Sequence, residues 1–191
     1  AGESVARIEL LPQVEQVKDK GYEILYFTEN VDEFAVRMMQ SYQEKEFQSV
    51  LDSKLDLDSE EEKKALEEKQ EASKDMLEAV KKALEGKVGN VKLSGHLKSH
   101  PVCLSSEGDL SMEMAKTLNA MPGSEGQKLQ AQTVLEINPE HAIYQKLMDM
   151  QEDSSEQLDD YAKLLYDQAL LIAGMPIEDP VAFSNRICKL M

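Results

Sequence analysis

Apolar and polar positions follow two different periods at the start of the chain. After Ser4, apolar residues recur every three or four positions, which predicts a helix that is capped by Ser4 and ends at Lys20-Gly21. The apolar face of this helix consists of Val5, Ile8, Leu11 and Val14. Directly after it, the compact β-prone run at residues 22–27 predicts a short buried strand.

The following residues repeat the same order. A second helix is expected over residues 28–39, with Thr28 or Asn30 as its cap, and the run at residues 46–51 predicts a closing strand. Helices that alternate with strands imply a small parallel sheet with helices packed on it. We therefore expect a small α/β unit over residues 1–57. Because many functions share this architecture, it leaves a small α/β enzyme open as an interpretation.

A charged stretch separates this unit from the rest of the chain. Residues 58–71 contain seven acidic residues and three lysines with almost no apolar stripe, which is typical of an exposed helix. A stripe with helical spacing then returns before Gly86, and it consists of Met76, Leu77, Val80 and Leu84. We interpret residues 58–75 as a connector helix that leads into a second domain over residues 76–191.

The second domain combines short strands with terminal helices. Strand-like alternation occurs in "NVKLSGHL", "HPVCL" and "QTVLEINP". Helical spacing returns in three segments at residues 140–150, 154–174 and 179–191, and Asp179 is the expected cap of the last one. The fold class expected for the whole chain is α+β: a small α/β unit followed by a mixed α+β domain with a short sheet and terminal helices.

A short helix between glycine-containing breaks is expected at residues 109–121. Its stripe is formed by Leu110, Met114, Leu118 and Met121, and Met112 and Ala115 broaden it. A methionine-rich stripe is usually part of a core. The flexible flanks at Gly108 and Gly126, together with the adaptable shape of methionine, favour instead a surface that accepts varied partners. The pattern leaves both interpretations open.

The terminal helices pose a similar choice. Near its end, the helix at residues 154–174 is apolar almost all round, so it needs cover on several sides. Pairing with a second copy of the chain would bury this surface in a four-helix cluster, whereas packing within one chain would make it an internal core. The spacing does not decide between the two.

Charge and motifs exclude several classes of function. The formal net charge of −16 repels phosphate, so nucleic acid is a poor candidate partner. No apolar run is long enough to cross a membrane, and no phosphate-binding or nucleophile-elbow motif occurs. His96 and His100 have metal-ligand spacing, but the flanking glycine and proline predict an extended segment, so neither a metal site nor a catalytic residue is expected. Cys103 and Cys188 are expected to be reduced thiols of a cytosolic protein.

Four blocks of the chain have a specific order and spacing. They are "KGYEILYFTENVDEF", "HPVCLSSEGDLSMEMAK", "VLEINPEH" and "LYDQALLIAGMPIEDPVAFSNRICKLM". These blocks resemble the carboxy-terminal part of the heat-shock protein 90 chaperone family, most closely its bacterial type, and the resemblance covers essentially the whole chain. It implies a piece of a homodimeric, ATP-driven chaperone, which agrees with a chain that begins without methionine.

The resemblance assigns a role to each part of the chain. Residues 1–57 would be the last small α/β part of the middle segment, and residues 76–191 the dimerisation domain. ATP and Mg would be bound upstream of Ala1, so this fragment is expected to hold no cofactor and to have no ATPase activity. The expected partners are a second copy of the chain and partly unfolded client proteins.

The resemblance also implies two sets of site residues. The client-binding set is Leu110, Met112, Met114, Leu118 and Met121. The dimerisation set is Tyr161, Leu164, Leu165, Ala169, Leu171, Ile172, Val181, Phe183, Ile187, Leu190 and Met191. Two departures from the family pattern are Thr117, where an apolar residue would widen the client face, and the ending "ICKLM", which lacks the acidic tail that recruits eukaryotic co-chaperones. The first predicts a narrower client face. The second favours a cytoplasmic bacterial protein, although an organelle form or a truncated chain would also lack the tail. An adaptor for a single partner is the rival interpretation.

Overall fold

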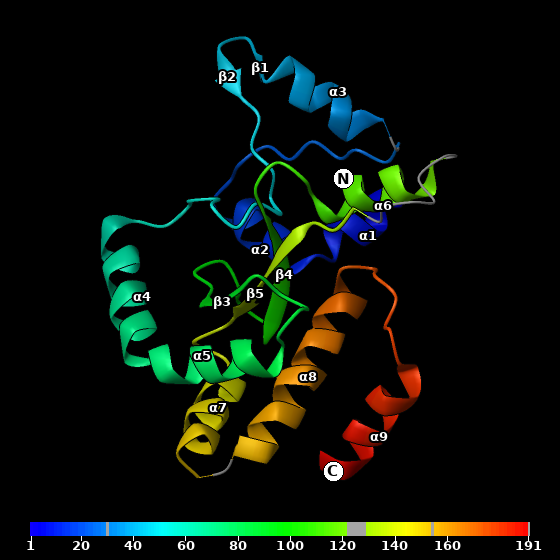
Figure 1. The fold of residues 1–191 in the computed structure, drawn as a ribbon. Coiled ribbons are helices and arrows are strands. Elements are labelled where there is room, and N and C mark those ends of the chain that lie inside the picture. The colour runs from blue at the N-terminus through cyan, green and yellow to red at the C-terminus, as the bar shows by residue number, and fades with distance from the viewer. Residues whose placement is uncertain (30, 122–128, 154, 191) are drawn as a thin grey trace.

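The computed structural model describes residues 1–29, 31–121, 129–153 and 155–190, so Asn30, Gly126 and Met191 lie outside the described residues. Within these ranges, nine helices and two small sheets form a mixed α+β fold (Figure 1). The predicted fold class is therefore confirmed.

The helices and strands have the following bounds. The helices are α1 (Val5–Glu9), α2 (Pro12–Asp19), α3 (Asp32–Met39), α4 (Glu60–Ala72), α5 (Lys74–Ala83), α6 (Met112–Ala120), α7 (Ala142–Asp153), α8 (Ser155–Ile172) and α9 (Pro180–Leu190). The strands are β1 (Ser41–Tyr42), β2 (Lys45–Glu46), β3 (Asn90–Leu93), β4 (Val102–Glu107) and β5 (Gln132–Ile137).

The larger sheet has β5 at its centre. β3 pairs with β5 in parallel and β4 pairs with it antiparallel, so all three strands predicted from alternation are confirmed. One face of the sheet belongs to the main core together with α5, α7 and α8, and it carries Val91, Leu93, Val102, Leu104, Leu135 and Ile137. Because successive side chains of a strand point to opposite faces, the other face carries a different set of residues.

That second face contains a buried carboxylate. Glu136 of β5 is only 2% exposed. Its Oε1 accepts a hydrogen bond from Ser105 Oγ (2.6 Å) and lies 3.3 Å from Lys92 Nζ. Its Oε2 accepts a hydrogen bond from Ser94 Oγ (2.7 Å). A buried charge is costly unless it is paired and hydrogen-bonded, so these three neighbours explain how the sheet accommodates a carboxylate.

The segment that precedes the predicted connector (residues 1–57) covers the outer edge of β4. The Gln13 side-chain amide of α2 donates to the Leu104 carbonyl (2.9 Å). Farther along β4, the Ser106 N–H donates to the Leu51 carbonyl (2.8 Å), and the Ser53 N–H donates to the Ser106 carbonyl (3.0 Å). An edge strand otherwise leaves its backbone groups unpaired, so these bonds both complete β4 and attach the preceding segment to the sheet.

Two strands expected in that segment are wrong. Residues 22–27 form no strand, and Tyr22 and Leu25 are 58% and 52% exposed. Of the run at residues 46–51, only Glu46 lies in a strand, in the two-residue antiparallel hairpin of β1 and β2. A strand is stable only beside a neighbour, and among the described residues the pairing of this segment with β4 is limited to one parallel bridge between Asp52 and Ser106. The small parallel sheet expected within residues 1–57 is therefore not formed among the described residues.

The first expected helix is interrupted. The Ser4 cap is confirmed, because Ser4 Oγ accepts a hydrogen bond from the Arg7 N–H (3.3 Å). A second helix, α2, begins at Pro12, since proline lacks an N–H and cannot continue the preceding turn. The α3 helix is confirmed, but its N-cap is Val31 without a side-chain hydrogen bond, so the prediction of Thr28 as cap is wrong.

The predicted connector helix bends at Ser73. None of the residues of α4 is buried, as its charged sequence predicts. The Ser73 hydroxyl donates to the Lys69 carbonyl (2.6 Å) and lies 2.7 Å from the Tyr144 hydroxyl of α7. Figure 1 shows α5 running across the end of α4 rather than continuing it. The division into two domains at residues 58–75 stays a prediction.

The Glu136 pair leads to a stability prediction. Lys92→Met should lower the free energy of unfolding by about 2–4 kcal/mol, because it leaves a buried carboxylate without its cation. The double variant K92M/E136Q removes both charges and should recover most of this loss. Lys64→Met on exposed α4 is the control and should change stability by less than about 0.5 kcal/mol. Urea unfolding measures all three, and equal stability of K92M and K64M would contradict a buried ion pair.

Candidate functional site

The helix α6 begins later than the sequence predicts. The chain turns at Gly108, which has a φ of +84°, and Ser111 then caps the helix by accepting a hydrogen bond from the Met114 N–H (3.1 Å). Leu110 therefore lies before the cap and does not continue the helical stripe. Serine at this position satisfies an N–H that has no partner within the helix, which is why α6 starts here.

The five predicted client-binding residues differ in burial. Met112 is 8% exposed and belongs to the main core. Leu110, Met114 and Leu118 are half-buried, and Met121, directly after the helix, is 49% exposed. One of the five predicted residues is therefore buried in the core, and the other four are exposed to solvent to different degrees.

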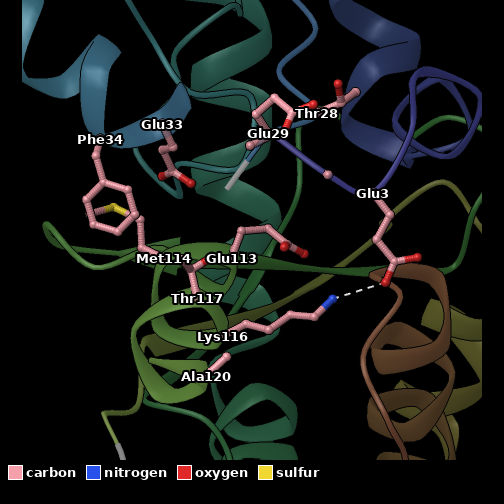
Figure 2. Close-up of a pocket in the computed structure, with 12 residues that line it drawn as sticks. Glu3, Thr28, Glu29, Glu33, Phe34, Glu113, Met114, Lys116, Thr117 and Ala120 are labelled. Carbon is pink, nitrogen blue, oxygen red and sulfur yellow. Dashed lines mark hydrogen bonds and ion pairs between the residues drawn. The ribbon is translucent and has the colours of Figure 1, made fainter. Parts of the chain in front are cut away.

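A cavity of about 160 Å³ lies between α6 and α3. Figure 2 shows the side chains of Phe34 and Met114 extending toward each other from these two helices. Thr117 and Ala120 also line the cavity from α6. Thr117 is the residue that departs from the apolar family pattern, so the cavity is less apolar on this side.

Charged groups surround this cavity. Its lining includes the carboxylates of Glu3, Glu29, Glu33 and Glu113 and the ammonium of Lys116. Lys116 Nζ lies 3.1 Å from Glu3 Oε1, and this hydrogen bond lowers the pKa of Glu3 below its usual value. Glu33 is paired with Arg37 (3.3 Å). The cavity therefore combines apolar walls with a mainly acidic rim.

Half of the cavity was not predicted from the sequence. Phe34, Glu29 and Glu33 come from the segment before the connector, which the sequence treats as part of a separate unit. One signal was available in the sequence: Val31, Phe34 and Met38 have helical spacing. The structure adds that none of the described residues of α3 is buried. An apolar stripe on a short helix without a buried face indicates a surface that faces something else.

A larger cavity of about 490 Å³ lies among α1, α6 and the end of α8. Its lining brings together Met112 of the predicted client set and three residues of the predicted dimer set, Ala169, Leu171 and Ile172. Gln13 is also part of it, and Gln13 Oε1 is buried without a hydrogen-bond partner among the described residues.

The predicted dimer residues of α8 face in two directions. Leu165 and Ala169 are 3% and 0% exposed and belong to the main core. Tyr161, Leu164 and Ile172 are half-buried, whereas Leu171 is 52% exposed. One side of α8 is therefore used within the chain, and its last turn carries apolar area toward solvent.

The last helix, α9, packs against α8 and is poorly covered. Its cap is confirmed, because Asp179 Oδ1 accepts hydrogen bonds from the Val181 and Ala182 N–H groups (3.1 and 2.9 Å). Ion pairs join it to α8: Arg186 with Asp167 and Lys189 with Asp160, each at 2.5 Å. None of the described α9 residues is buried.

The apolar residues of α9 remain partly open to solvent. Val181 is 70% exposed, and Phe183, Ile187 and Leu190 are half-buried. Met191, the last member of the predicted set, lies outside the described residues. Among the described residues, α9 thus has one strongly exposed apolar residue, Val181, and three that are only partly covered.

The two histidines have separate partners. His96 lies within hydrogen-bond distance of Gln16 Oε1 (2.6 Å) and the Leu55 carbonyl (2.7 Å), while His100 lies beside Ser99 (3.0 Å). In the part of the chain that the structure describes, no group of three possible metal ligands is found. None of the described helices is long and apolar enough to span a membrane.

Comparison with known proteins gives a consistent result. The family model described as "Hsp90 protein" matches residues 1–191. The chain is 55% identical over 190 residues to the chaperone protein HtpG of Bacillus subtilis strain 168, and 55% identical over 190 residues to HtpG of Halalkalibacterium halodurans. HtpG of Clostridium perfringens is 54% identical over 190 residues. All of this chain is covered in each case, but it spans about 30% of the length of these curated relatives.

The α6 cap can be tested directly. Ser111→Ala removes the side-chain acceptor of the Met114 N–H and should destabilise α6 by about 1 kcal/mol. Amide hydrogen exchange should then become several-fold faster within α6, with little change in β3 and β5. Ser184→Ala, on exposed α9, is the matched control and should leave α6 unchanged. Unaltered exchange of α6 in S111A would show that packing, not the cap, defines its start.

Proposed function

The chain belongs to the Hsp90 family, and from this premise we propose that it is the dimerisation and client-binding part of a bacterial, cytoplasmic, ATP-dependent chaperone. The observation that carries the proposal is the uncovered apolar surface of α8 and α9. The chain spans about 30% of the length of its curated relatives. In this proposal, ATP and Mg bind a segment outside these residues. The chain itself then has no catalytic role.

Dimerisation is supported by what a single chain leaves exposed. Leu171 and Val181 are more than half exposed, and none of the described residues of α9 is buried. Pairing of α8 and α9 with a second copy across a two-fold axis would form a four-helix cluster that covers this surface. Each apolar side chain that becomes fully buried stabilises such a dimer by roughly 1.5–3 kcal/mol. Leu165 and Ala169 already lie in the core, so their contribution to the dimer is indirect.

Client binding is supported by the cavity between α3 and α6. Phe34 and Met114 offer apolar area at the surface, and Met114 can adapt its shape to different partners. Partly unfolded proteins expose the apolar side chains that such a cavity accepts. Because Phe34 precedes the connector and Met114 follows it, movement between the two parts of the chain would alter the cavity.

The two surfaces together give a mechanical function. The dimer contact joins two protomers at one end, so that nucleotide-driven closure elsewhere in the protein would act as a clamp on a client held near α6. Competition among several unrelated clients for this surface would distinguish a chaperone from an adaptor, because an adaptor binds a single partner.

The dimer surface is tested by Val181→Asp in the full-length protein. A carboxylate at this position would lose hydration in the dimer, so the dissociation constant of the dimer should rise by at least about tenfold. Light scattering across a dilution series measures the change. Ala65→Asp, on exposed α4, introduces the same charge far from α9 and should leave the dimer intact. A dimer of unchanged strength in V181D would remove α9 from the interface.

The client site is tested by Met114→Ser and Phe34→Ser. Each variant should bind a permanently unfolded, fluorescently labelled protein about five- to thirtyfold more weakly, because one apolar anchor of roughly 1–2 kcal/mol is lost. Met38→Ser is the matched control, since Met38 lies on the same helix as Phe34 but is 86% exposed and does not line the cavity. Equal losses in all three variants would indicate general apolar attraction rather than a site between α3 and α6.

A further inference from the structure

The cavity between α3 and α6 combines apolar walls with a rim of one predominant charge. Phe34 and Met114 line it from α3 and α6, and Figure 2 shows Glu29, Glu33 and Glu113 to one side of this pair. We propose that this site selects polypeptide segments in which an apolar side chain is flanked by lysine or arginine. This inference rests on the proposed client-binding function and specifies the class of client segment.

The carboxylates of the rim are not equally available. Glu3 is paired with both Lys116 and Arg7 (3.1 Å each), and Glu33 is paired with Arg37. The carboxylates of Glu29 and Glu113, by contrast, have no hydrogen-bond or ion-pair partner among the described residues. These two groups are therefore the ones that a positively charged flanking residue can reach without breaking an existing pair.

The size of the cavity suits a single apolar side chain. It measures about 160 Å³, and an apolar cavity of about 150 Å³ holds a group the size of benzene. A leucine, methionine or phenylalanine side chain can thus fit into the cavity beside Phe34 and Met114. The long aliphatic stems of neighbouring lysine or arginine residues can lie along the apolar walls while their charged ends reach the rim.

Flanking acidic residues would meet the opposite situation. An acidic side chain of the client segment would be repelled by the carboxylates of Glu29 and Glu113. Complementary charge between two partners affects specificity and the rate of encounter more than total affinity. The net charge of −16 also attracts basic segments from a distance. A test must therefore separate the local rim from the charge of the whole molecule.

Short labelled peptides with one apolar centre and flanks of lysine, glutamine or glutamate provide that test. We expect the full-length protein to bind the lysine-flanked peptide about five- to tenfold more tightly than the glutamate-flanked one at low salt, and salt should weaken this preference. The variant E29Q/E113Q should reduce the preference to about twofold, because it removes the charge of the two rim carboxylates that are unpaired among the described residues.

The control variant E67Q/E68Q carries the same change of net charge on exposed α4. It should keep the full preference for lysine flanks. An equal reduction in both variants would overturn the inference, because the preference would then follow from total charge. If M114S and F34S abolish binding but E29Q/E113Q keeps the preference, the rim has no selective role although the client site stands. If M114S and F34S bind every peptide normally, the client site itself is contradicted.

Discussion

The outer edge of β4 is the constraint on which the candidate site depends. Gln13 binds the Leu104 carbonyl, and the backbone around Leu51 pairs with Ser106, so the segment before the connector is held to one strand at two points. The helix α3 lies between these two points in the sequence, and α6 follows directly after β4. Both walls of the smaller cavity are therefore positioned by the pairing of a single strand, although they belong to parts of the chain that the sequence separates.

Local patterns predicted those parts of the fold that local forces determine. β3, β4 and β5 follow from alternation, and the caps at Ser4 and Asp179 follow from side chains that reach their own backbone. The strand expected at residues 22–27 failed because pairing requires a neighbour that the run itself does not reveal. The stripe on α6 shows which residues share a face, but only packing determines that Met112 points inward and Met114 outward. The spacing of Val31, Phe34 and Met38 indicates an apolar stripe on α3, but its contact with α6 is a property of the tertiary structure and could not be predicted.

The helix α8 has buried apolar residues on one side and an exposed apolar residue on another. Ala169 is fully buried against the sheet, whereas Leu171, two residues later, is more than half exposed. A helix with apolar residues on both sides needs cover on both, and the described residues cover one side more fully than the other. The ion pairs from Asp167 and Asp160 to α9 are polar contacts that keep α9 alongside α8 without burying it. The arrangement leaves a preformed pair of helices, which lowers the ordering entropy that association would otherwise cost.

The bend at Ser73 gives α4 the properties of a lever arm. α4 has 13 residues, so it extends about 20 Å from the bend. The Ser73 hydroxyl, which contacts both the Lys69 carbonyl and the Tyr144 hydroxyl, fixes the pivot to α7 rather than leaving it to solvent. A rotation of about five degrees at this pivot displaces the far end of α4 by almost 2 Å. A small change of angle at Ser73 would therefore become a linear displacement at the start of α4, and a force applied there would act on α7 as a torque.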